Sequence, residues 1–199
     1  GKNMWTSVND YKQFANTFYS WTRDFSSVVY DGTHSDKRSD LITYQSYNEF
    51  SRGINSIPSS DANYTDNYKH IRRTNLLLQN AEAYAKPEDI KQYIGEAYFF
   101  RAYSYFDLLQ LYGDVIITKK PLDITDPEMK VKRNDRSEVV DLIIDDLNHA
   151  VENLPAFKEL TTEEEGRISK EGAQAFLSRV ALYEGTWQKS RNGNQNTQR

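Results

Sequence analysis

Residues 31–50 carry the side chains of this chain that are best suited to hold a carbohydrate. The segment combines short acids, amides and an arginine with two tyrosines and a phenylalanine. Sugars stack their apolar C–H faces on aromatic rings, while Asp, Asn and Arg form hydrogen bonds with hydroxyl groups. The candidate ligand-binding residues are Asp36, Arg38, Asp40, Tyr44, Tyr47 and Asn48. The alternative is an ordinary capping loop whose tyrosines pack on neighbouring helices.

The sequence contains no pattern typical of a metal site or of a nucleophilic catalytic site. His34, His70 and His149 are far apart and lack the spacing of a metal-ligand set. The absence of cysteine excludes disulfides, thiol catalysis and cysteine-bound metals. There is also no glycine-rich phosphate loop, nucleophile elbow or His-Glu-x-x-His motif. We therefore expect no metal and no cofactor.

Carboxylates are plentiful, and a glycosidase would need two of them flanking the scissile bond. Asp141, Asp145 and Asp146 share one predicted helix, and residues 163–165 are a run of glutamates. Such patterns are typical of a solvated face, so we expect no catalytic step, and a glycoside hydrolase remains an alternative. Calcium stays an unsupported alternative: Asp123, Asp126 and Glu128 could offer oxygens to it, but they do not fit a twelve-residue calcium loop with its glycine.

The length and net charge of the chain further limit the classes of protein and partner that it fits. The chain has 199 residues, 38% of them hydrophobic and 27% charged, which is enough to bury a core. Its net charge of −4 gives no general attraction to nucleic acid or to anionic membranes. The sequence contains no run of eighteen apolar residues, so it predicts no transmembrane helix.

Apolar residues recur at helical spacing over most of the chain. The predicted helices cover residues 8–21, 66–84, 87–112, 135–154 and, from 169 or 170, up to 187. Ser7 or Thr6 is expected to cap the first helix, and Gly113 to end the third in a left-handed conformation. In residues 24–65, glycine, proline and short polar residues interrupt the helical spacing of apolar residues. Long irregular segments of compact domains often carry function, so we expect this segment to be the most relevant to ligand binding. Residues 191–199 are predicted to be a loop or frayed tail.

The last four helices form two similar pairs. Arg101 and Tyr105 of the first pair correspond to Arg179 and Tyr183 of the second. Recurring helix pairs with small residues at their crossings are similar to tetratricopeptide units, so the second pair should stack on the first. We expect an all-α fold of tetratricopeptide-like helix pairs with long irregular loops. Buried arginines need acidic partners, and Glu96 or an acid of a neighbouring helix is expected to serve Arg101.

The third predicted helix and the sequence after it resemble a known family. Its signature-like residues are Glu96, Arg101, Tyr105, Tyr112, Gly113 and Asp114, and further blocks follow at Lys120-Pro121, residues 136–143 and residues 166–170. These blocks, in this order, resemble the SusD/RagB family over most of residues 66–190. Ile116 departs from the pattern, because family members often have proline there.

The resemblance implies a lipoprotein on the outer-membrane surface of a Bacteroidetes-type bacterium, anchored by an N-terminal lipid that would precede Gly1. Such a protein would bind an oligosaccharide or polysaccharide without catalysis and deliver it to a SusC-like TonB-dependent transporter. Residues 1–190 would be its N-terminal helical region, and residues 191–199 a polar tail or the start of a missing C-terminal part. The alternative is a peptide-binding RagB-like member or a protein-interaction module.

Overall fold

The computed structural model describes residues 4–22 and 59–196, with side chains as far as Arg191. Within these ranges the regular structure is helical apart from an isolated antiparallel bridge between Val115 and Asn134. The α-helices are α1 (Val8–Asn16), α3 (Ala62–Ala81), α4 (Lys91–Tyr112), α5 (Arg136–Asn153) and α6 (Lys170–Asn196). Short 3₁₀ turns are Thr17–Trp21, Pro87–Ile90, Pro127–Met129, Phe157–Glu159 and Thr162–Glu164. The all-α prediction is confirmed.

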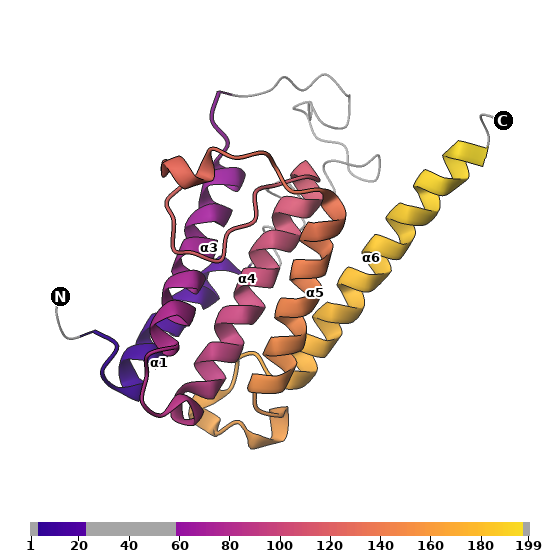
Figure 1. The fold of residues 1–199 in the computed structure, drawn as a ribbon. Coiled ribbons are helices and arrows are strands. Elements are labelled where there is room, and N and C mark those ends of the chain that lie inside the picture. The colour runs from indigo at the N-terminus through magenta and orange to yellow at the C-terminus, as the bar shows by residue number, and fades with distance from the viewer. Residues whose placement is uncertain (1–3, 23–58, 197–199) are drawn as a thin grey trace, which may run out of the picture.

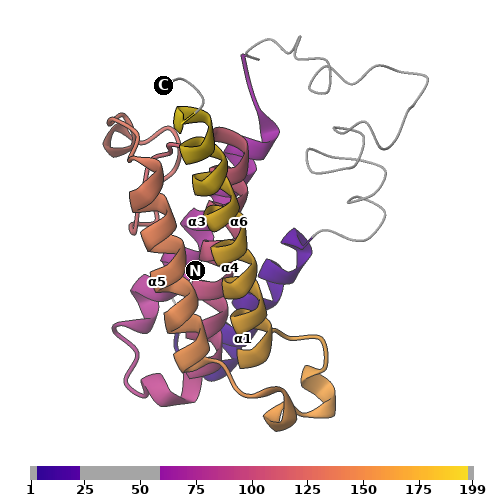
Figure 2. The ribbon, with the colours of Figure 1, turned by 90° about the vertical axis from the view of Figure 1, so that its right-hand side faces the viewer.

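Helix α4 occupies the middle of the bundle. Figure 1 shows α3, α4 and α5 side by side, with α4 between the other two and α1 packed against α3 and α4 near the turn that joins them. Helix α6 begins beside the end of α5 and runs back antiparallel to it, as Figure 2 shows from the side. The second helix pair therefore stacks on the first, as predicted for tetratricopeptide-like units.

The composition of α4 explains its central position. Aromatic side chains point from it in several directions, and Phe99, Phe100, Tyr105 and Phe106 are all buried. A helix that is apolar on most of its circumference must be covered on most sides. Together with the 3₁₀ turn at Pro87–Ile90, α4 forms the continuous rod predicted for residues 87–112. Gly113 caps it with φ of 69°, and its N–H donates to the carbonyl of Leu109 at 3.0 Å.

Two helix ends differ from the sequence prediction. Helix α3 starts four residues earlier than Asp66, because the carboxylate of Asp61 accepts a hydrogen bond from the N–H of Asn63 at 2.9 Å and caps it. Helix α6 continues to Asn196, so the loop or frayed tail predicted from residue 191 is wrong for residues 191–196. Polar residues without proline can extend a helix that has already formed. The division of the chain at residue 190 stays a prediction.

A buried ion pair joins the three central helices. The guanidinium of Arg101 on α4 donates from Nε and Nη2 to the two carboxylate oxygens of Asp146 on α5, at 2.8 and 2.6 Å. Its Nη1 donates to Oδ1 of Asn75 on α3, at 2.7 Å. The expectation of a neighbouring-helix acid as partner is confirmed. The solvated position expected for Asp146 is wrong, since this side chain is fully buried while Asp145 is exposed.

A second buried pair lies nearer the N-terminal end of α4. Glu96 on α4 is fully buried, and its two oxygens accept hydrogen bonds from Nε and Nη2 of Arg167, at 2.7 and 2.6 Å. Arg167 precedes α6, so the pair ties the connection between α5 and α6 to the bundle centre. The N–H of Ile168 donates to the hydroxyl of Tyr19 at 3.0 Å, which brings in the N-terminal segment. Arg179 corresponds to Arg101 in the repeat and is expected to be buried like it, but it is exposed.

We predict that Asp146→Ala lowers the free energy of unfolding by about 3–5 kcal/mol, because it leaves the guanidinium of Arg101 buried without its counter-charge. Chemical denaturation followed by circular dichroism measures the change. Asp145→Ala removes the neighbouring exposed carboxylate and should change the value by less than about 0.5 kcal/mol. Equal losses in the two variants would contradict the prediction.

Candidate functional site

The six ligand-binding candidates from the sequence lie outside the described residues. They are Asp36, Arg38, Asp40, Tyr44, Tyr47 and Asn48, all within residues 23–58. The family-signature residues are described and fall into two groups. Glu96, Arg101 and Tyr105 are buried in the centre of α4, while Tyr112, Gly113 and Asp114 lie at its C-terminal end. The first group therefore stabilises the scaffold, and the second borders two open cavities.

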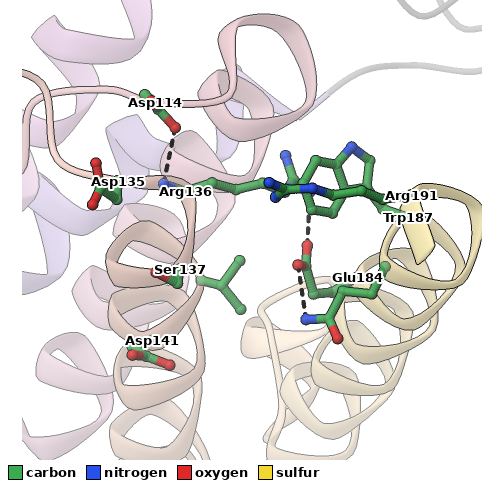
Figure 3. Close-up of a pocket in the computed structure, with 10 residues that line it drawn as sticks. Asp114, Asp135, Arg136, Ser137, Asp141, Glu184, Trp187 and Arg191 are labelled. Carbon is green, nitrogen blue, oxygen red and sulfur yellow. Dashed lines mark hydrogen bonds and ion pairs between the residues drawn. The ribbon is translucent and has the colours of Figure 1, made fainter. Parts of the chain in front are cut away.

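The groove lies between the start of α5 and the second half of α6. These helices run antiparallel and diverge toward the C-terminal end of α6, as Figure 1 shows. The cavity there measures about 690 Å³, within the range of roughly 300–1,000 Å³ that is usual for ligand sites. Its lining residues, drawn in Figure 3, are Asp114, Asp135, Arg136, Ser137, Val140, Asp141, Glu184, Trp187, Gln188 and Arg191.

Arg136 is the residue that spans the groove. It is the first residue of α5, and its backbone N–H donates to Oδ1 of Asp114 at 2.9 Å. Its side chain reaches α6, where Nη2 donates to Oε2 of Glu184 at 2.7 Å (Figure 3). Both side chains of this ion pair are only 12% exposed. Such a pair, largely removed from water, keeps its geometry better than a surface pair does.

Trp187 lies beside this ion pair with arginines close to its ring. The guanidinium carbon of Arg136 is 4.1 Å from the ring centroid, and that of Arg191 is 5.4 Å from it. Both contacts are cation–π interactions, which hold the indole in place. Gln188 adds an amide that donates to Glu184 at 3.2 Å. The groove thus presents a fixed aromatic ring among exposed donors and acceptors.

A second hollow opens on the other side of Arg136 and Trp187. It measures about 520 Å³ and shares Asp114, Arg136, Trp187 and Arg191 with the groove. Its remaining lining residues are Leu109, Gln110, Tyr112, Gly113, Arg133 and Tyr183. We call it the arginine hollow. The hydroxyl of Tyr112 donates to Asp61 at 2.6 Å, so this ring is held by the cap of α3.

A smaller pocket of about 160 Å³ lies between Trp21 and the start of α3, close to the two ends of the described ranges. The ring of Trp21 stacks on His70 with centroids 4.1 Å apart and planes 15° apart. The other lining residues are Ala62, Asn63, Asp66, Asn67, Tyr103 and Asp107. Burial lowers the pKa of His70 to about 4, although Asp66 and Asp107 favour its charged form. This imidazole is therefore neutral at physiological pH.

The described residues contain no group of three or more histidines and acids that could hold a metal ion. The acids weighed for calcium serve other contacts: the carboxylate of Asp126 accepts the N–H of Asp123, and Glu128 pairs with Lys120. In the same part of the chain, no helix is both long enough and apolar enough to span a bilayer.

A family model decides what this scaffold is. Residues 3–182 match the SusD-like model described as "Starch-binding associating with outer membrane". The chain belongs to the SusD-like family. The resemblance seen in the sequence is thereby confirmed.

Individual SusD-like proteins agree with the family match. The chain is 33% identical over 133 residues to SusD-like protein P38 of Formosa agariphila, which covers 65% of this chain and 25% of the relative. A SusD-like crystal structure from Bacteroides fragilis superposes with a TM-score of 0.75 at 27% identity, over 94% of this chain and 37% of that one. A laminarin-binding SusD-like protein superposes with a TM-score of 0.60 at 30% identity, over 70% and 30% of the two chains. The chain thus spans about a quarter to somewhat more than a third of the length of these SusD-like relatives.

Sequence reasoning missed the residues that build the groove. Arg136 belongs to the family-like block at residues 136–143 and Trp187 ends the last predicted helix, but these patterns do not identify either residue as part of a site. The signal available was the spacing of Trp187 and Arg191, which places an indole and a guanidinium on one helix face. The partnership of Arg136 with Glu184 joins residues 48 positions apart, so local spacing does not reveal it.

His70 makes the stability of this SusD-like chain depend on pH. The unfolded imidazole has a pKa of about 6.5, whereas that of the folded one is about 4. The unfolded chain therefore binds an extra proton between these values, and stability that is complete above pH 6.5 is lost as the pH falls to 4. We predict that wild type loses about 1–2 kcal/mol more than His70→Gln between pH 7.5 and 4.5, allowing for partial solvent screening. Urea denaturation at both pH values measures this, and parallel losses would contradict it.

Proposed function

We propose that this chain is the N-terminal helical part of a non-catalytic protein that binds an oligosaccharide at the bacterial surface. The observation that carries the proposal is the match of residues 3–182 to a family described as starch-binding and outer-membrane-associated. A solved relative that is 30% identical is described as laminarin-binding. In the proposed role the protein delivers its ligand to a SusC-like TonB-dependent transporter, and a lipid on its N-terminal side attaches it to the outer membrane.

The groove between α5 and α6 supports this proposal physically. Oligosaccharides need an aromatic face together with hydrogen-bonding groups that are already in position, because ordering loose side chains costs affinity. Here Trp187 is held by Arg136, which is itself held by Glu184 and Asp114. Exposed Asp135, Ser137, Asp141 and Gln188 then border the ring. The groove is therefore pre-formed for a ligand rich in hydroxyl groups.

The candidates Asp36, Arg38, Asp40, Tyr44, Tyr47 and Asn48 remain part of the proposal. Their support is the chemistry of their side chains. The Trp21–His70 pocket lies next to the ends of their segment. In this proposal the ligand face has two parts, one on that segment and one in the groove. The two parts are testable separately.

We predict that Trp187→Ala weakens oligosaccharide binding by about tenfold, equivalent to about 1.4 kcal/mol, because it removes the aromatic face of the groove. Isothermal titration calorimetry against a panel of neutral and acidic oligosaccharides measures the dissociation constants. Leu182→Ala is the matched control, because Leu182 is a large apolar residue of α6 that is 73% exposed and does not line the groove. Wild-type affinity in Trp187→Ala, together with a loss in Tyr47→Ala, would place the ligand on the other segment only.

The same panel tests the competing functions. Binding of peptides with no response to any oligosaccharide would replace the proposal with a RagB-like peptide-binding or protein-interaction role. Release of reducing sugar during long incubation would indicate a glycoside hydrolase. We expect oligosaccharide binding without release. Two of the four groove carboxylates are engaged, Glu184 by Arg136 and Asp114 by a backbone N–H, so release of sugar would point to exposed Asp135 and Asp141 as the pair to change.

A further inference from the structure

We propose that the ligand of this groove is an anionic oligosaccharide, whose carboxylate or sulfate group is held in the arginine hollow. This inference rests on the proposed function and specifies its substrate class. It starts from the charges on the two sides of the Arg136–Trp187 contact. The two sides share their central residues but differ in the groups around them.

The sign of the local charge differs between the two sides. The groove has four carboxylates, of Asp114, Asp135, Asp141 and Glu184, against two arginines. The arginine hollow has three arginines and a single carboxylate among its lining residues. In a chain of net charge −4, three arginines lining one hollow are a local exception. An anionic group therefore gains most on the side of the hollow.

Two of the three arginines are available to a ligand. Arg136 is tied to Glu184, but Arg133 and Arg191 are exposed. No carboxylate of the described residues lies within salt-bridge distance of either one. Guanidinium groups bind carboxylates and sulfates through paired N–H donors, which gives them directional as well as electrostatic preference. The hollow can thus take an anion without first breaking an ion pair.

The surrounding rings favour a sugar as the carrier of that anion. Tyr183, Trp187 and Tyr112 all line the hollow, and the last is anchored through its hydroxyl to Asp61. Flat aromatic faces beside guanidinium groups suit a pyranose ring that bears a charged substituent, since the ring stacks and the substituent pairs. The hydroxyl-binding side chains of the groove continue from the same place. A chain of sugars could therefore place its acidic unit in the hollow and its next unit in the groove.

Calorimetric titration of the chain with three oligosaccharides of equal length tests the inference. The probes are an oligogalacturonate, a sulfated galactan oligosaccharide and a neutral malto-oligosaccharide, at pH 7 and low salt. We expect at least one acidic probe to bind tenfold or more tightly than the neutral one. We also expect its affinity to fall several-fold when the sodium chloride concentration is raised to 0.5 M, because exposed charges are screened. The two acidic probes distinguish a carboxylate site from a sulfate site.

Arginine variants test whether the preference for acidic probes arises in the arginine hollow. The double change Arg133→Gln and Arg191→Gln should weaken binding of the preferred acidic probe tenfold or more. Arg133→Gln alone, at an arginine that lines the hollow but not the groove, should weaken the acidic probe and leave the neutral probe unchanged. Arg179→Gln is the matched control, since Arg179 is an exposed arginine of α6 that lines neither cavity. Circular dichroism of each variant checks that the helices are intact.

The outcomes separate the two proposals. Binding of the neutral probe as tightly as the acidic ones, or equal affinities in the double variant and Arg179→Gln, overturns the anionic preference and leaves the oligosaccharide-binding function standing. Failure of this chain to bind any of the three probes or any member of the wider panel overturns both.

Discussion

The contact between Arg101 and Asp146 is the constraint on which the rest of the structure depends. Two opposite charges are buried where α3, α4 and α5 meet, and Asn75 completes the hydrogen bonds of the guanidinium. Burying either charge alone would cost several kcal/mol, so the helices can pack only in the register that brings the partners together. The amide of Asn75 also donates to the carbonyls of Thr118 and Lys120, at 3.0 and 2.8 Å. One pair thus fixes three helices and the connection that follows α4.

This fixed centre determines where the groove can form. The connection after α4 carries Asp114, which receives the first N–H of α5, and the Glu96–Arg167 pair fixes the segment that leads into α6. Both walls of the groove are therefore anchored to the same rod. Close approach adds to the rigidity, because a Cβ placed on Gly95 would meet Leu154 at 2.9 Å, which is closer than real side chains pack. The ligand side chains consequently stand on a scaffold with little freedom to rearrange.

The sequence predicted the parts of this fold that local patterns determine. Apolar spacing located α4 and its glycine cap, and the need to neutralise a buried guanidinium anticipated an acid from a neighbouring helix for Arg101. Local patterns failed where the outcome depends on distant residues. Asp146 looks like any acid on a solvated helix face until Arg101 is placed opposite it. Arg179 looks equivalent to Arg101 by repeat position, yet α6 has no helix packed beyond it among the described residues, and Arg179 is exposed. The groove escaped prediction for the same reason, because Arg136 and Glu184 meet only when α5 and α6 are antiparallel.

The length of α6 has a mechanical consequence. Its buried residues Ala173 and Val180 lie in its first half, and the rest of the helix extends away from the bundle as in Figure 1. At 1.5 Å per residue the 27-residue helix is about 40 Å long, so a pivot of about 5° at its base would swing its tip by roughly 3 Å. The Arg136–Glu184 ion pair connects α6 to α5 about halfway along the length of α6. A change that breaks this ion pair would therefore alter the tilt of α6. Spectroscopic labels near the C-terminal end of the helix would detect it best, because the displacement is largest there.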